Sequence, residues 1–200
     1  MPPPSGGGRR PREQASPGSR VTTLSPRRAF LRALRARAAR IAITSSSMRG
    51  KGVSAAITVM REQCLTLDLR RFGIPSEDAF VAALDDATDA ALSALPPICR
   101  FWGLARKGLN IYLRECLYTH YLRQAYYLNL TEEYFELPLD KWTGTRLHAF
   151  DRSVPPWASV RGLTPEESAA YQEAATRAAT TRGLARVHLD AFWWGLREES

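Results

Sequence analysis

The stretch from residue 98 to residue 128 constrains the fold of this chain more than any other part of the sequence. It contains no proline, and it is long enough for about eight helical turns. Apolar residues occur on every side of such a helix: Leu104, Ile111, Tyr118 and Leu122 on one flank, and Leu109, Leu113, Cys116 and Leu117 on the other. A helix that is apolar all round is normally buried by its neighbours. We therefore predict an all-α fold, a compact domain of about five helices around a central buried helix at 98–128.

A short polar line interrupts this apolar surface. Lys107, Asn110 and Arg114 follow the i, i+3, i+7 spacing that places side chains on one helical face, and Gly103 and Tyr121 fall on the same line. Burying an unpaired cation is costly, so a central helix carries such residues only with partners or beside an open cleft.

Two interpretations of the polar line follow. In the first, Asp140 and Asp190, each a lone acid in an apolar stretch, neutralise the cations in an internal network. In the second, the line is the floor of a cleft, where cations face phosphate or carboxylate groups, an aromatic ring stacks on a base and an aspartate acts as general base. The ligand-binding residues of that site are Lys107, Asn110, Arg114, Tyr121 and Trp102, and its catalytic residues are Asp140 and Asp190. Both interpretations place these residues close together, and an open cavity would favour the second.

The basic residues are concentrated near the N-terminus. Residues 1–61 hold 13 Arg and Lys and one acid, whereas residues 62–200 hold 15 basic and 19 acidic residues. The composition of residues 1–24, rich in Pro, Gly, Ser and Arg, predicts disorder. Ser25 and Pro26 then predict the start of an amphipathic helix over 26–43, with Phe30 and Ile41 on its apolar face.

We accordingly predict a disordered basic arm over residues 1–49 and an all-α domain over residues 50–197. Three roles fit such an arm. It is a solvated charged extension, an arm that binds nucleic acid or an anionic surface by releasing counterions, or a transit-type presequence.

Capping signals mark the helices that flank the central one. Ser76 precedes an acidic first turn, and Thr164, Pro165 and Glu167 form a complete helix start for 165–181, which Gly183 follows. Helical periodicity also occurs at 53–72 and at 184–199. Residues 134–157, which follow the central helix, are dense in proline, glycine and aromatic residues. This composition predicts a packed connector with a short helix near Asp140.

The remaining composition restricts the class of protein. Three cysteines lie far apart, and no histidine shows metal-ligand spacing, so we predict neither a metal site nor a cofactor. No run of 18 apolar residues and no signal-peptide core are present, which predicts a cytoplasmic protein without a membrane span. The sequence leaves the oligomeric state open.

Two resemblances add expectations of their own. The segment from Arg114 to His120 is similar to the R-x(4–6)-H motif of HEPN ribonucleases, which are small all-α proteins. That resemblance implies that Arg114 and His120 form an RNA-cleaving pair, although Glu115 stands where the family usually has Asn, Asp or His. The motifs WGLARKGLNIYL, ELPLDKW and ARVHLDAFWW resemble those of small helical bacterial proteins to which no activity is attached, which supports a domain over about residues 50–197.

These observations lead to three hypotheses of function. The first is a nucleic-acid-associated binding module, whose partner is nucleic acid or another phosphate-bearing ligand. The second is an enzyme that acts on a phosphate-bearing substrate such as a nucleotide or nucleic acid. The third is a structural or interaction protein whose polar line is a buried ion-pair network.

Overall fold

The computed structural model describes residues 25–50 and 52–198, and these form helices and no strand. The α-helices are α1 (Pro26–Ala42), α2 (Val53–Thr66), α3 (Glu77–Ala94), α4 (Trp102–Tyr118), α5 (His120–Ala125), α6 (Lys141–Phe150), α7 (Pro165–Thr180) and α8 (Leu189–Glu198). Short 3-10 helices connect them: η1 (Leu69–Gly73), η2 (Pro97–Cys99), η3 (Leu128–Leu130), η4 (Glu132–Tyr134) and η5 (Arg186–His188). The all-α prediction is confirmed. The predicted count of about five is too low for the described residues, because the long central helix is divided and the connector forms α6.

Local capping explains where several helices begin. Ser25 Oγ accepts a hydrogen bond from the Arg28 N–H at 3.4 Å, and Ser76 Oγ accepts one from the Ala79 N–H at 3.3 Å. Thr164 begins α7 with a reciprocal capping box. Side-chain acceptors satisfy N–H groups that have no partner within the helix, so each start is determined by a few adjacent residues.

The central helix is shorter than the sequence predicted. α4 ends at Tyr118, and Thr119 has extended backbone angles (φ −84°, ψ 105°) before α5 begins. Thr119 Oγ1 donates to the Glu115 carbonyl at 2.8 Å, which is the kind of side-chain bond that bends helices. The prediction of a single helix over 98–128 is therefore wrong at both ends. Before α4 the chain forms the separate helix η2, and after α4 it forms α5 and η3.

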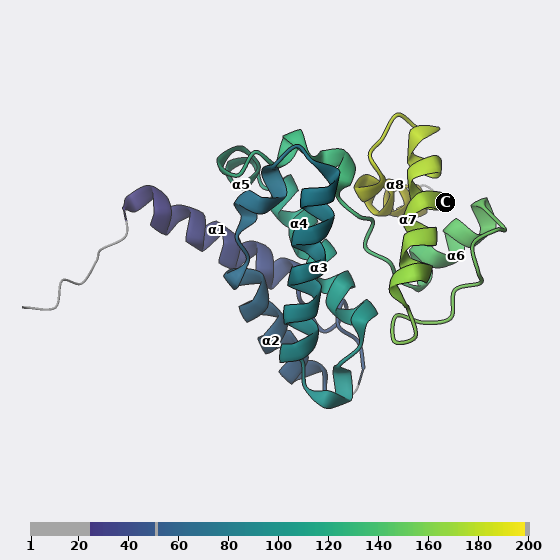
Figure 1. Cartoon of the computed structure of the whole chain (residues 1–200), viewed down its shortest axis with the longest axis horizontal. Helices are drawn as coiled ribbons and strands as arrows, with labels where there is room; N and C mark the ends of the chain where they lie inside the picture. Colours follow the sequence, from purple (N-terminus) through teal and green to yellow (C-terminus); the bar gives the residue numbers. More distant parts are fainter. Residues whose placement is uncertain (1–24, 51, 199–200) are drawn as a thin grey trace, which may run out of the picture.

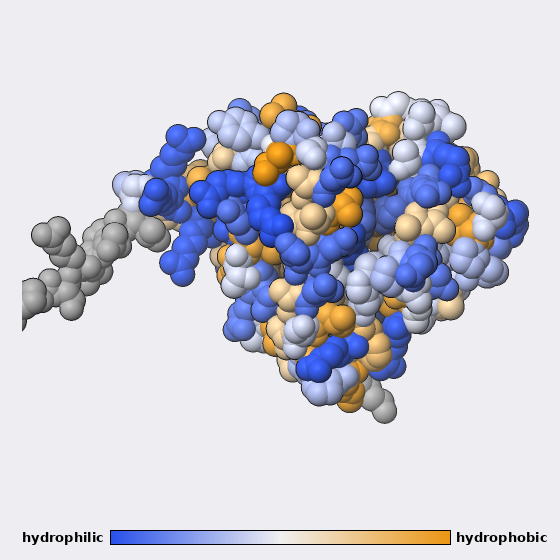
Figure 2. All heavy atoms as spheres, in the orientation of Figure 1, coloured by the Kyte–Doolittle hydropathy of each residue, from blue (hydrophilic) through white to orange (hydrophobic). Residues whose placement is uncertain are grey.

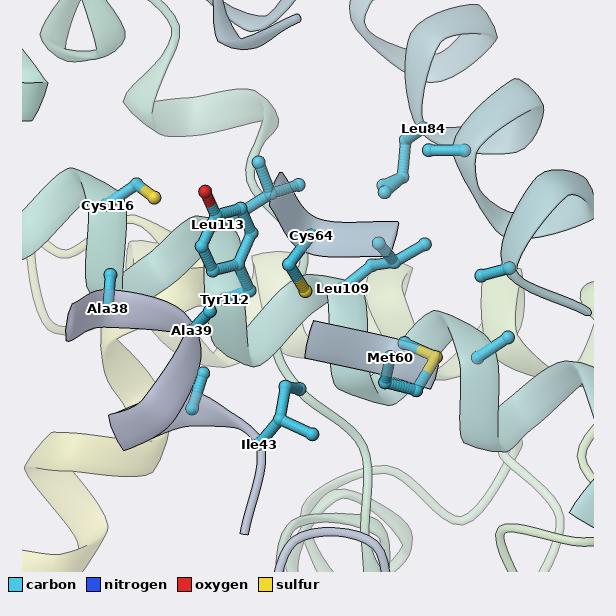
Figure 3. Packing of buried hydrophobic residues seen from close by; sticks show 14 of the residues in the cluster. Ala38, Ala39, Ile43, Met60, Cys64, Leu84, Leu109, Tyr112, Leu113 and Cys116 are labelled. Atoms are coloured by element: carbon cyan, nitrogen blue, oxygen red, sulfur yellow. The ribbon is translucent and has the colours of Figure 1, made fainter. Parts of the chain in front are cut away.

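α4 is nevertheless the centre of the larger of two hydrophobic clusters. Its Leu109, Tyr112 and Leu113 pack against residues of α1, α2 and α3 (Figure 3). Gly108 permits close packing, because a Cβ at this position would lie 2.7 Å from Met60 Cε. The prediction that this part of the chain is buried by its neighbours holds for α4.

α1 belongs to the same cluster. Ala38, Ala39, Ala42 and Ile43 are buried against α4 and α2. The buried face is thus turned away from Phe30 and Ile41, which are exposed. The core extends N-terminal to the boundary predicted near residue 50, because small alanine side chains let α1 approach α4 closely. Residues 1–24 of the predicted arm lie outside the described residues.

α6, α7 and α8 form the second hydrophobic cluster with the connector around Leu137 and Leu163. In Figure 1 these helices lie together on one side of α4, while α1 and α2 lie on the other. None of the described helices is long and apolar enough to cross a bilayer. The face of α4 between the two clusters carries the polar residues discussed next.

Candidate functional site

Four polar residues of α4 lie where the two hydrophobic clusters meet. We call Arg106, Lys107, Asn110 and Arg114 the α4 polar face. Arg106 and Asn110 are buried, while Lys107 and Arg114 are largely buried. Every one of them contacts an acid, so the face is an ion-pair network between the two parts of the fold.

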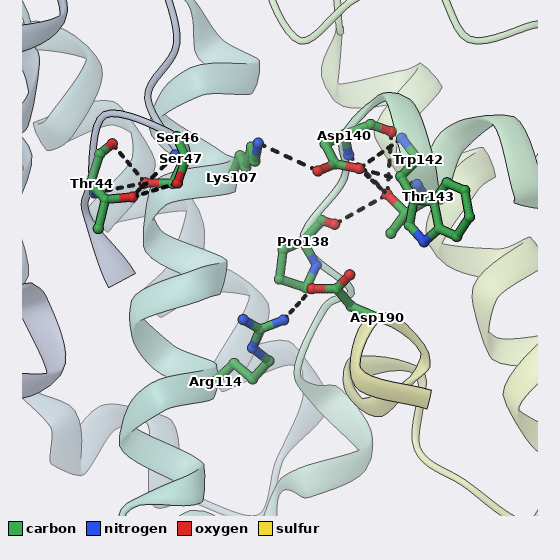
Figure 4. Close-up of polar contacts among 10 residues, drawn as sticks. All are labelled: Thr44, Ser46, Ser47, Lys107, Arg114, Pro138, Asp140, Trp142, Thr143 and Asp190. Atoms are coloured by element: carbon green, nitrogen blue, oxygen red, sulfur yellow. Dashed lines mark hydrogen bonds and ion pairs between the residues drawn. The ribbon is translucent and has the colours of Figure 1, made fainter. Parts of the chain in front are cut away.

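The two aspartates predicted from the sequence face the predicted cations (Figure 4). Asp140 Oδ2 lies 3.7 Å from Lys107 Nζ, and Asp190 forms a direct ion pair with Arg114. Asp140 also accepts from the backbone N–H groups of Trp142 and Thr143 and thereby caps α6. Asp140 and Asp190 were predicted as candidate general bases. In the structure both are paired with cations of the protein itself.

The strongest part of the network was missed by sequence analysis. Arg106 binds Glu136 through two parallel bonds of 2.8 and 2.7 Å, and it also reaches Asp85 and the Thr88 hydroxyl. Asn110 Nδ2 donates to the same Glu136 carboxylate at 2.8 Å. Glu136 follows an acidic, aromatic segment, and no local pattern distinguishes it from solvent-exposed glutamates.

Burial and pairing set the charge states of this face. Burial raises the pKa of the Glu136 carboxyl, but the bonds from Arg106 and Asn110 outweigh it, so the pKa lies below its ordinary value. For Lys107 burial dominates, and the more distant Asp140 offsets it only in part, so the pKa of its ammonium is lowered. Glu136 is thus a stabilised anion, whereas Lys107 is a poorly compensated cation.

The hollow beside Lys107 and Asn110 is too small for a ligand. The hollow lined by Gly103, Lys107, Asn110, Leu139 and Leu163 has no room for a water molecule. Trp102 is half-buried, and its ring lies 5.5 Å from the Arg106 guanidinium carbon. The geometry therefore fits the internal network better than a cleft.

Gly103 shows how tightly this junction is packed. A Cβ at Gly103 would lie 2.3 Å from the Val160 carbonyl oxygen and 2.9 Å from Leu163 Cβ. We expect Gly103→Ala to lower the free energy of unfolding by about 1–3 kcal/mol, since the connector must move away from α4. Urea denaturation measures this, with Gly195→Ala as control, because no atom lies within 4 Å of that Cβ. Equal stability of Gly103→Ala and wild type would contradict the close approach.

Tyr121 is the one predicted ligand-binding residue that lies on the open surface. The residue is 56% exposed, and its ring packs edge-on against Phe30 of α1, with centroids 5.2 Å apart. It comes from α5, beyond the bend at Thr119, so it does not share the α4 polar face. The bend thus separates Tyr121 from Lys107, Asn110 and Arg114.

Exposed arginines surround α1, the helix whose Phe30 contacts this tyrosine. The exposed arginines of α1, which we call the α1 basic face, are Arg27, Arg28, Arg32, Arg37 and Arg40. Within the described residues, no acid forms an ion pair with any of them. Figure 2 shows hydrophilic side chains gathered over the N-terminal half of α1. This face keeps its charge available for a partner.

The two residues of the HEPN-like motif lie in different surroundings. Arg114 pairs with Asp190 and contacts Glu115 at 3.5 Å. His120 is exposed at the start of α5, and its ring packs edge-on against Tyr121. Among the described residues, no hydrogen bond joins the side chains of Arg114 and His120.

Comparison of the chain with protein-family models, with curated proteins and with solved structures gives no match.

Proposed function

We propose that this chain is a nucleic-acid-binding module and that the α1 basic face is its contact surface. The observation that carries the proposal is a helix with five exposed arginines and no acid. Its own Phe30 and the neighbouring Tyr121 are exposed aromatic rings. Guanidinium groups bind phosphates, and release of condensed counterions supplies much of the affinity. Aromatic rings next to such cations offer surfaces on which bases stack.

The α4 polar face has a structural role in this proposal. Arg106 and Arg114 form close ion pairs with Glu136 and Asp190, Lys107 lies 3.7 Å from Asp140, and the hollow beside Lys107 has no room for a water molecule. We therefore assign phosphate binding to the exposed arginines of α1, which form no ion pair within the described residues, and not to Lys107 and Arg114.

The expected result is salt-dependent binding that weakens when the α1 arginines are neutralised. Each arginine that contacts a phosphate contributes about one unit or slightly less to the slope of log affinity against log salt. We expect the triple variant Arg27→Gln, Arg28→Gln and Arg32→Gln to reduce that slope by about 2–3. Fluorescence anisotropy with labelled single-stranded and duplex oligonucleotides between 50 and 300 mM salt, the range in which counterion release is readily measured, provides the test.

The control is Arg152→Gln, which removes one exposed cation from the loop after α6 and lies outside the proposed surface. An unchanged slope in the triple variant would contradict the proposal. Vesicles of anionic phospholipid form a parallel arm of the experiment. Binding to vesicles without binding to any oligonucleotide would assign the basic face to membrane surfaces and overturn the proposal.

A further inference from the structure

Three exposed rings from α1 and α5 lie in contact with one another. The Tyr121 ring packs edge-on against Phe30 of α1, with centroids 5.2 Å apart and an interplanar angle of 77°. The His120 ring makes a second edge-on contact with Tyr121, with centroids 5.3 Å apart at 79°. All three residues are exposed, Phe30 by 45% and Tyr121 by 56%. We call Phe30, His120 and Tyr121 the ring cluster.

The hydrophobic core does not use the ring cluster. α5 places the fully buried Leu122 in the larger hydrophobic cluster, and Tyr121, one position earlier, lies about 100° away around the helix. The buried face of α1 is formed by alanines further along the helix. Exposed apolar side chains that stand singly are common on protein surfaces, whereas contiguous ones mark interaction sites. The ring cluster is therefore a candidate contact surface.

Open cations flank the ring cluster on α1. Arg27 and Arg37 stand three residues before and seven residues after Phe30, spacings that place side chains on one face of a helix. Both arginines are exposed, and no described acid forms an ion pair with either. They are about 15 Å apart along the helix axis, with Phe30 between them. One face of α1 thus offers positive charge and aromatic surface together.

The packing of α5 against α1 disfavours a duplex. A helix with its side chains is about 10–12 Å wide, and the major groove is about 12 Å wide, so the groove admits a single helix. From Phe30 onwards α1 is not a single helix, because α5 lies beside it and α2 and α4 cover its buried face (Figure 1). The bases of a duplex are also stacked on one another, so a protein ring reaches their faces only after unstacking. A single strand has neither restriction.

We infer that this surface selects single-stranded nucleic acid and that its unpaired bases stack on Tyr121 and Phe30. The inference rests on the proposed function, because the arginines of α1 hold the phosphate backbone. Every base has a flat face, so strands of different sequence bind with similar affinity. Tyr121 carries no charge and determines the preference for unpaired bases, whereas the arginines determine the salt dependence.

An abasic strand separates stacking from phosphate binding, because it carries the phosphates of a normal strand without the bases. Fluorescence anisotropy of the full chain at physiological salt compares a single strand, its duplex and the abasic strand, all of equal length. We expect the single strand to bind more tightly than the duplex and at least about fivefold more tightly than the abasic strand. Tyr121→Ala weakens single-strand binding by about 5- to 150-fold, the effect of one stacked base, and leaves abasic binding and the salt slope unchanged.

Phe150→Ala is the matched control for Phe30→Ala. Phe150 is 46% exposed, as Phe30 is, but it ends α6 on the other side of α4. Tyr121→Phe keeps the ring and should keep the single-strand preference. Circular dichroism verifies that each variant folds as wild type does. Equal losses of single-strand and abasic binding in Tyr121→Ala would overturn the stacking role.

The outcomes distinguish this inference from the proposed function. The single strand and the duplex are each prepared as DNA and as RNA, because both offer phosphates and bases, and a single-strand preference in either supports the inference. Duplexes bound as tightly as single strands, with a salt slope that falls in the triple arginine variant, would overturn the inference and leave the proposed function standing. Failure of every ligand to bind would remove the proposed function and this inference with it.

Discussion

Replacing Arg106 with methionine lowers the free energy of unfolding by about 3–5 kcal/mol, the loss expected when one partner of a buried ion pair is removed. The side chains of Arg106 and Glu136 are 7% and 11% exposed. Without Arg106, the Glu136 carboxylate keeps only its bond to Asn110 and remains in a place with little access to water. For a chain of this size the loss corresponds to a fall in Tm of roughly 6–20 °C.

Lys107→Met is the matched control for Arg106→Met. Lys107 is the next residue of the same helix and is also largely buried, but its partner Asp140 is 3.7 Å away and 40% exposed. Asp140 stays hydrated and continues to cap α6 after the substitution. We therefore expect Lys107→Met to unfold at or above the wild-type urea midpoint. Similar losses in both variants would contradict the distinction between a bidentate buried pair and a loose one.

The pH dependence of stability provides a second measurement on the same network. Because the pKa of Glu136 is lower in the folded chain than in the unfolded one, the carboxylate stabilises the fold above its unfolded pKa of about 4.3. That contribution is lost as the pH falls from there through the folded pKa. Glu136→Gln removes it, so the variant is less stable than wild type at pH 7 and the difference narrows in acid. A difference that is independent of pH would show that the charge of Glu136 is unimportant.

We expect removal of residues 1–47 to abolish folding. This deletion removes α1, and with it the buried Ala38, Ala39, Ala42 and Ile43 from the surface of α4. The uncovered surface includes Tyr112 and Cys64, which are fully buried in the intact chain. Circular dichroism and size-exclusion chromatography of the truncated protein and of the full chain measure the difference. A cooperatively folded protein without residues 1–47 would contradict the placement of α1 in the core.

A single substitution at Arg35 tests the packing of α1 without removing the helix. Its guanidinium donates to the carbonyl oxygens of Cys64, Leu65 and Leu67 at the end of α2 and to the Tyr112 hydroxyl. Arg35→Met removes all of these bonds, and hydrogen bonds to charged groups contribute about 1.5–3 kcal/mol. Arg37→Met on the exposed side of α1 should change stability by less than about 0.5 kcal/mol. Equal effects of the two substitutions on stability would contradict a stabilising role for the hydrogen bonds of Arg35 to α2 and Tyr112.

The sequence by itself determined the local features of this protein. Ser25, Ser76 and the Thr164 capping box predict helix starts, because capping depends on residues within one turn. The sequence also predicted Asp140 and Asp190 as partners of the cations on α4, and the structure shows which pairs form: Lys107 with Asp140 and Arg114 with Asp190. A cation on a helix without a solvent-exposed side needs a partner, and few acids stand in apolar stretches.

Only the tertiary structure decided which surfaces are buried and which polar groups meet. The Arg-rich composition of α1 predicted an arm, but its alanines and Arg35 place it in the core, because burial depends on the facing surface of α4. Glu136 and the hydrogen-bonded side chains of Tyr118, His188 and Glu132 have no local signature. Their hydrogen-bond partners lie 26 to 70 residues away along the chain, so these contacts form only when α4 packs against the segments after it.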